Sequence, residues 1–361
     1  MPLVAHTALP TFDLLKKQGM EIHEIGQTSD QDIPELHIGF LNLMPDAAFK
    51  ATERQFLHLV GSSIQNIHYY VHPFTIDGVV RDEATMDYIN TYYTSFDVLK
   101  TSGLDALILT GTNPANPTLE LEPFWEPLGE VIDWAAENVT SMMCSCLAVH
   151  AIVKHKHNIE RKLLQKKSWG VYSQRITNSN HPLLKNINSP FEVPHSRNND
   201  ISAEQLKAAG FEILVQGTES GVHMAVSPDM FRMVYLQGHP EYDKISLLKE
   251  YKREVIQYFE GARVTFPDNP ENYFNLDIDE LIHPYREAVT RAKDIGYKMP
   301  VLPEIEIESF LENTWRATGE AVFDNWLGLV HQLTNTDRYL PFKAGIDPDD
   351  PLNLKTALRG K

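Results

Sequence analysis

The chain has 361 residues, a formal net charge of −17, 42% hydrophobic residues and 22% charged residues. These values are typical of a globular protein and exclude a disordered or fibrous one. No stretch approaches the roughly 18 apolar residues of a membrane span, we expect no secretory signal, and the acidic balance argues against general binding to nucleic acid.

The predicted elements alternate between strands and helices along most of the chain. Hydrophobic patterning predicts strands at 36–44, 67–71, 104–110 and 139–144, and helices at 47–59, 124–137 and 147–154. Later strands are predicted at 187–193, 211–216, 224–226 and 233–237, and later helices at 244–259 and 315–333. This alternation predicts an α/β fold, a parallel-sheet sandwich with helices on both faces.

The chain is predicted to be one domain with an appendage at each end. We expect residues 1–35 to be an N-terminal extension packing on the core, 36–335 to be a single α/β domain, and 336–361 to be a C-terminal tail. Within the domain, we expect residues 261–313 to form an expanded irregular insert. The aromatic helix at 315–333 is expected to cover the core, and a contribution to a homodimer is the alternative.

The two cysteines, Cys144 and Cys146, lie where a predicted strand gives way to a predicted helix. Two thiols this close make a poor disulfide, and no second ligand pair suggests a metal site. A helix N-terminus favours the reactive thiolate, and the following N–H groups can hold an oxyanion. The turn position favours Cys146 as a nucleophile, whereas the alternative is that both cysteines are buried apolar residues.

Polar residues follow or precede other predicted strands. His239 and Glu241 come directly after a strand, at the sheet edge where parallel sheets place their active sites, so the carboxylate can orient the imidazole. The segments 194–200 and 166–172 and the residue Arg253 can offer cations and hydroxyls to a small charged substrate. Solvated loops and surface ion pairs are the alternatives for all of these positions.

Several sequence motifs between residues 8 and 335 resemble the motifs of one enzyme family in their order and spacing. They are Leu41-Asn42-Leu43-Met44-Pro45, Ala51-Thr52-Glu53-Arg54-Gln55-Phe56, Leu109-Thr110-Gly111, Val139-Thr140-Ser141, Gly170-Val171-Tyr172, Pro194-His195-Ser196-Arg197, Gly238-His239-Pro240-Glu241-Tyr242-Asp243 and Phe323-Asp324-Asn325-Trp326-Leu327. The family is that of homoserine O-succinyltransferases and O-acetyltransferases, whose fold is similar to class I glutamine amidotransferases.

The resemblance implies a role for each matched position. It makes Cys146 the acyl-accepting nucleophile, His239 the general base and Glu241 its carboxylate partner. It places the substrate-binding residues at Lys167, Ser196 and Arg253. The oxyanion would be held by backbone N–H groups of Leu147 and of the Thr112–Asn113 loop.

Two departures from the family pattern concern the acyl group. The family has a Lys-Lys pair directly after the Met-Pro motif. This chain has residues 46–50 at that point, so Lys50 is the candidate replacement for the pair. The family position linked to the choice of acyl group is a Gly or Glu, and Ala115 occupies it here. A small uncharged residue leaves room for a succinyl group and does not repel its carboxylate, although a missing lysine pair weakens that inference.

The function expected from these observations is homoserine O-acylation in methionine biosynthesis, with succinyl-CoA favoured over acetyl-CoA. The expected partners are acyl-CoA as co-substrate and L-homoserine, with no resident cofactor, no metal, no nucleic acid and no membrane, in the cytoplasm. Serine as the acceptor is one alternative. Glutamine hydrolysis is another, although Ser145 and Leu147 stand where amidotransferases usually flank the cysteine with glycines.

Overall fold

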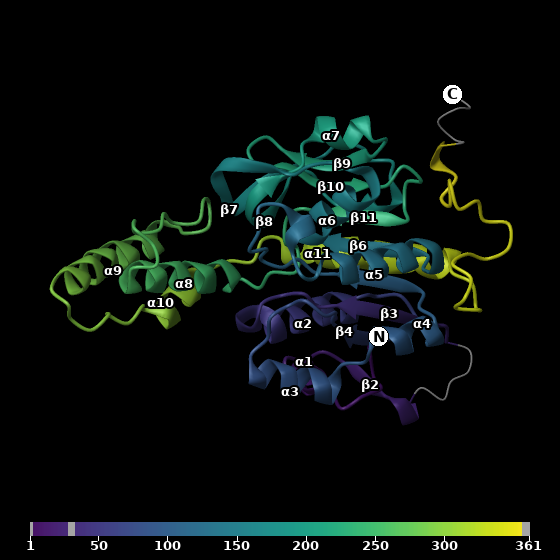
Figure 1. The fold of residues 1–361 in the computed structure, drawn as a ribbon, viewed down its shortest axis with the longest axis horizontal. Coiled ribbons are helices and arrows are strands. Elements are labelled where there is room, and N and C mark those ends of the chain that lie inside the picture. Colours follow the sequence, from purple (N-terminus) through teal and green to yellow (C-terminus); the bar gives the residue numbers. More distant parts are fainter. Residues whose placement is uncertain (1–2, 28–32, 356–361) are drawn as a thin grey trace.

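The computed structural model describes residues 3–27 and 33–355, which form a sheet of eleven strands packed between helices (Figure 1). The strands are β1 (Leu3–Ala5), β2 (Ile22–Glu24), β3 (Glu35–Leu41), β4 (His68–Phe74), β5 (Ala106–Leu109), β6 (Ser141–Ser145), β7 (Lys162–Ile176), β8 (Phe191–Asp200), β9 (Glu212–Gly217), β10 (Gly221–Val226) and β11 (Met233–Leu236). The helices are α1 (Pro10–Lys17), α2 (Asp46–Gly61), α3 (Glu83–Tyr92), α4 (Phe96–Ser102), α5 (Trp125–Asn138), α6 (Leu147–His157), α7 (Ala203–Ala208), α8 (Ser246–Glu260), α9 (Leu276–Asp294), α10 (Glu304–Phe310) and α11 (Arg316–Leu333). The predicted α/β class is confirmed.

The strand order brings the ends of distant strands together. The sheet runs β2-β1-β4-β3-β5-β6-β11-β10-β9-β7-β8, parallel from β2 to β11 and antiparallel from β11 to β8. Leu109 of β5 lies opposite Cys144 of β6, and Leu236 of β11 lies opposite Ser145. The carboxyl ends of three adjacent strands therefore share one edge, and the loops that follow them meet there.

The hydrophobic core covers both faces of the sheet. Along β5, Ala106 and Ile108 belong to a cluster with α2 and α11, whereas Leu107 and Leu109 belong to a cluster with α5 and α6. Successive side chains of a strand point to opposite faces, so these helices form two separate layers. The aromatic side chains of α11, such as Trp326, are buried, and this helix covers the core as expected.

Helices α8, α9 and α10 form a projection at one side of the body (Figure 1). A third hydrophobic cluster joins Trp169 and Val171 of β7 to Tyr251 of α8 and Ile282 of α9. The projection is therefore attached to the sheet through β7, an antiparallel strand.

Residues 261–313 are not the irregular insert that was predicted, because they contain α9 and α10. Asn275 caps α9 by accepting a hydrogen bond from the Ile278 N–H at 3.0 Å. Pro284 lies inside this helix and removes one donor from it. An internal proline usually ends a helix, which is why the pattern concealed this one.

The two ends of the chain contribute to the body. The described part of the predicted extension at 1–35 supplies β1 and β2, which form one edge of the sheet. Each of these strands is three residues long, too short for alternation to be visible in the sequence. In the described part of the tail, residues 336–355, Phe342 is buried and the carbonyl of Pro341 accepts a hydrogen bond from Thr140.

Candidate active site

Cys146 occupies the sharp turn between β6 and α6. Its backbone has φ 51° and ψ −113°, a strained conformation for a residue with a side chain, and α6 begins at the next residue, Leu147. The Cys146 N–H donates to the carbonyl of Leu236 in β11 at 2.7 Å, which anchors the turn. Such a turn lifts the side chain out of the backbone at the start of a helix, where the first N–H groups have no partner within the helix.

The loop after β5 packs tightly on this turn. A Cβ at Gly111 would lie 3.2 Å from both the Cβ of Cys146 and the backbone N of Leu147. Thr112 is half-buried, and Asn113 and Ala115 are exposed on the same loop. Glycine at position 111 therefore allows the loop to lie directly against the predicted nucleophile.

Cys144 has a different environment, although it is only two residues away. It lies within β6, fully buried in the cluster beneath α5 and α6. Burial raises the pKa of the Cys144 thiol, so this cysteine stays protonated. Of the two thiols, only that of Cys146 is partly exposed.

His239 and Glu241 form a buried pair on the loop after β11. The Nδ1 atom of His239 lies 2.7 Å from a carboxylate oxygen of Glu241, and its backbone N–H donates to the carbonyl of Pro194 at 2.8 Å. Both side chains are almost fully buried. Burial disfavours an imidazolium, but the negative charges of Glu241 and of the hydrogen-bonded Cys146 thiolate outweigh it and raise the pKa of His239 well above its usual value.

Tyr242 links this pair to a second polar group. Its ring stacks on the His239 ring with centroids 4.3 Å apart, and its hydroxyl donates to Glu250 of α8 at 2.8 Å. The indole N–H of Trp315 holds the Tyr242 carbonyl at 2.7 Å. Sequence reasoning singled out neither Tyr242 nor Glu250. Tyr242 belongs to the Gly-His-Pro-Glu-Tyr-Asp motif, whereas no local sequence pattern distinguishes Glu250 from the other residues of its helix.

Lys167 and Ser196 both contact Glu250. The Ser196 hydroxyl donates to Glu250 at 2.5 Å. The ammonium of Lys167 lies 3.6 Å from Glu250 and 2.7 Å from Glu254, above the ring of Trp169. These contacts join β7, β8 and α8 into one polar cluster next to His239.

Two other predicted residues have no such contacts. Arg253 is exposed on α8 and makes no hydrogen bond or ion pair with the described residues, although it lies one helical turn from Glu250. Lys50 is exposed on α2, and its ammonium lies over the ring of Tyr88 at 4.3 Å. The structure records no contact between either cation and Cys146.

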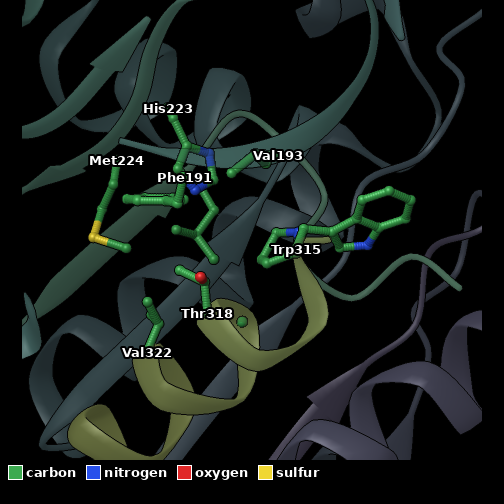
Figure 2. A pocket seen from close by; sticks show the side chains of 10 residues that line it. Phe191, Val193, His223, Met224, Trp315, Thr318 and Val322 are labelled. Carbon is green, nitrogen blue, oxygen red and sulfur yellow. The ribbon is translucent and has the colours of Figure 1, made fainter. Parts of the chain in front are cut away.

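A small cavity lies behind the His239 loop. Its volume is about 10 Å³, enough for a single water molecule and for no substrate. Figure 2 shows Phe191, Val193 and His223 on one side of it and Thr318 and Val322 of α11 on the other. The cavity therefore separates the sheet from α11 and is not a binding site for the reactants.

The described residues form neither a metal centre nor a membrane-spanning helix. In those residues, no group of three or more His, Cys, Asp and Glu side chains is arranged to hold a metal ion. No helix within residues 3–27 and 33–355 combines the length and the apolar character needed to cross a bilayer.

The fold and the site define an α/β protein with a cysteine at a strand-to-helix turn, beside a His–Glu pair that follows the neighbouring strand of the sheet. A glutamine amidotransferase structure from Methylobacillus flagellatus resembles the chain with a TM-score of 0.45 and 14% identity, covering 82% of this chain and 95% of that one.

Sequence comparison identifies the family. The model of the homoserine O-succinyltransferase family matches residues 2–336. A homoserine O-succinyltransferase from Methylococcus capsulatus is 51% identical, covering 98% of this chain and 100% of its own. One from Thiothrix nivea is 52% identical, covering 99% of each chain. The chain belongs to the homoserine O-succinyltransferase family, as its sequence motifs predicted, and it is an acyltransferase.

Proposed function

We propose that this protein transfers the succinyl group of succinyl-CoA to the hydroxyl of L-homoserine through a thioester on Cys146. Both substrates are those named for its relatives of about 50% identity. The reaction would be a step of methionine biosynthesis in the cytoplasm, with succinyl-CoA consumed as a co-substrate.

In the first half-reaction, the Cys146 thiolate attacks the carbonyl carbon of the succinyl thioester. The oxyanion that forms is held by backbone N–H groups at the start of α6, beginning with Leu147, and of the Thr112–Asn113 loop. The intermediate collapses by breaking the bond to the CoA sulfur, and coenzyme A leaves after receiving the proton held by His239. The product of this step is a succinyl thioester on Cys146.

In the second half-reaction, homoserine enters on the side of the polar cluster. Glu250 receives its ammonium group, Ser196 and Lys167 orient it, and Arg253 pairs with its carboxylate. His239 removes the proton of the homoserine hydroxyl, whose oxygen attacks the acyl carbon. The Cys146 sulfur leaves as a thiolate, and O-succinylhomoserine is released.

One observation carries this proposal: His239 is held by Glu241 at 2.7 Å, and despite burial its pKa is raised by Glu241 and by Cys146, a cysteine in a strained turn at a helix N-terminus. This is the arrangement that activates a thiol as a nucleophile. Tyr242 and Glu250 extend it directly to the polar cluster, so a nucleophile and an acceptor site lie side by side.

The test is to incubate the protein with succinyl-CoA and no acceptor, and to look for a covalent adduct by mass spectrometry. We expect one succinyl group on the peptide that carries Cys146, no adduct in Cys146→Ala, and an unchanged adduct in the matched control Cys144→Ala. Adding homoserine should discharge the adduct and yield O-succinylhomoserine. An active enzyme with Cys146→Ala, or faster discharge by serine or glutamine than by homoserine, would refute the proposal.

A further inference from the structure

Arg161 lies beside the loop that borders Cys146. It is half-buried between the end of α6 and the start of β7. One terminal nitrogen of its guanidinium, Nη2, donates to the carbonyls of Asn116 and Pro117, at 3.2 Å and 2.9 Å. These carbonyls belong to the loop that begins at Gly111, the residue packed against Cys146. Arg161 thus holds the far end of a loop whose near end touches the nucleophile.

The guanidinium of Arg161 is short of partners. Its Nε is buried and makes no hydrogen bond, and its Nη1 makes none with the described residues. Burial lowers the pKa of Arg161, and the negative charges of Glu122 and of the Cys146 thiolate oppose that shift. The charges of Arg161 and Cys146 therefore interact, and Nη1 is the terminal nitrogen of Arg161 that has no partner among the described residues.

Three other buried or half-buried arginines of the described chain have acidic partners, whereas Arg232 has none. Arg54 pairs with Asp243, Arg81 with Asp46, and Arg197 with Asp200. Arg161 forms no ion pair within the described residues. The charges of Glu122 and Glu160 act on Arg161 without contacting it, so an anionic ligand in direct contact would compensate further for its burial.

We propose that Arg161 binds the free carboxylate of the succinyl group while the other end of that group is bonded to Cys146. This rests on the proposed function. The Nη1 group of the guanidinium can donate a charge-assisted hydrogen bond to an oxygen of that carboxylate. An acetyl group has no carboxylate and would leave these donors unpaired, so Arg161 would select for succinyl-CoA.

The test compares two acyl donors of equal length in Arg161→Met. Butyryl-CoA has a methyl group where succinyl-CoA has its carboxylate. We expect kcat/KM with succinyl-CoA to fall about 10- to 100-fold, the range for a lost charge-assisted hydrogen bond, while kcat/KM with butyryl-CoA stays within about threefold. Arg161→Lys, which keeps the positive charge, should lose less and retain the preference for succinyl-CoA.

The matched control is Arg232→Met. Arg232 is also a part-buried arginine without an ion pair, and it donates to the carbonyl of Val139 at the opposite end of β6. We expect this variant to keep the wild-type ratio between the two donors. An equal loss with both donors in Arg161→Met would make Arg161 a support for the loop and overturn the inference, as would no loss with either. If both Arg161 variants fold poorly, the quantity to compare is the ratio of kcat/KM with succinyl-CoA to kcat/KM with butyryl-CoA. An equal ratio in Arg161→Lys and Arg161→Met would then overturn the inference. A wild-type protein that forms no acyl-enzyme would refute the proposed function instead.

Discussion

The two sides of the candidate active site are built in different ways. Cys146, His239 and Glu241 follow adjacent parallel strands, and backbone hydrogen bonds from Cys146 to Leu236 and from His239 to Pro194 hold the turns. The acceptor side, around Glu250, is made by antiparallel strands and by α8, which belongs to the projection. We infer that the reaction chemistry depends on the parallel sheet edge, and that acceptor choice depends on how the projection packs.

This comparison predicts the largest loss for His239→Asn. In the proposed mechanism, this change removes the group that exchanges protons with coenzyme A and with the acceptor hydroxyl. We expect kcat/KM to fall by about 10²- to 10⁴-fold with both substrates, and the rate of acyl-enzyme formation to fall with it. His283→Asn is the control, because His283 is exposed on α9 and pairs only with Glu287. Near-wild-type acylation of His239→Asn would remove this imidazole from the mechanism.

A smaller loss is expected for Glu241→Gln, together with a change in pH dependence. The Glu241 carboxylate raises the pKa of His239, so its removal lowers that pKa. The imidazolium would then be lost at a lower pH, and the alkaline limb of the rate of acyl-enzyme formation should move to lower pH. The measurement is that rate from pH 6 to 10, as a burst of coenzyme A release. A lower rate with an unmoved alkaline limb would contradict the electrostatic role.

Local signals in the sequence predicted the strands and loops that meet at this edge of the sheet. The apolar runs before Gly111, Cys146 and Gly238 predict strands, and the polar residues after them predict the loops at the sheet edge. A parallel sheet brings such loops together in every protein of its kind, so strand ends alone indicate a site.

The acceptor side depends on pairings that no local pattern contains. Lys167 was predicted ahead of a strand but lies inside β7, whose polar residues conceal its length. Glu250, Tyr242 and Arg161 become informative only when distant elements pack against them. Ser196 and Lys167 were predicted as substrate-binding residues from the family resemblance. The contacts that Glu250 makes with them became visible only in the structure.

A substitution on the acceptor side should affect the use of homoserine and leave the acylation of Cys146 unchanged. In Glu250→Gln, the charge that meets Lys167, Ser196 and Tyr242 is lost. We expect KM for homoserine to rise about 10-fold, since one charge-assisted contact is removed, while acyl-enzyme formation from succinyl-CoA remains unchanged. The control is Glu306→Gln on the exposed surface of α10. If acylation of Cys146 slowed as much as homoserine use, the two sides would not be separable.

The smallest effect concerns stability, at the edge of the sheet away from the active site. His6 follows β1 and lies beside His37 of β3 and His72 of β4, with 3.0 Å between ring nitrogens of His37 and His72. Burial, then nearby cations including Arg338, lowers the pKa of His37 and of His72 to about 3, and burial lowers that of His6.

These histidines predict a loss of stability in mild acid. The unfolded chain binds protons near pH 6.5, whereas the folded chain keeps the rings neutral, so the free energy of unfolding falls as the pH drops below about 6.5. By pH 5.5 each fully neutral ring contributes a loss of about 1 kcal/mol. The measurement is the urea midpoint of wild type and His72→Gln at pH 7.5 and 5.5. We expect the variant to be less sensitive to pH by about that amount, because it has one site fewer to protonate on unfolding. The buried His195 and His223 near the active site remain in the variant, so part of the pH dependence should persist. Equal pH sensitivity in both proteins would show that the ring of His72 is protonated to the same extent in the folded and unfolded chains.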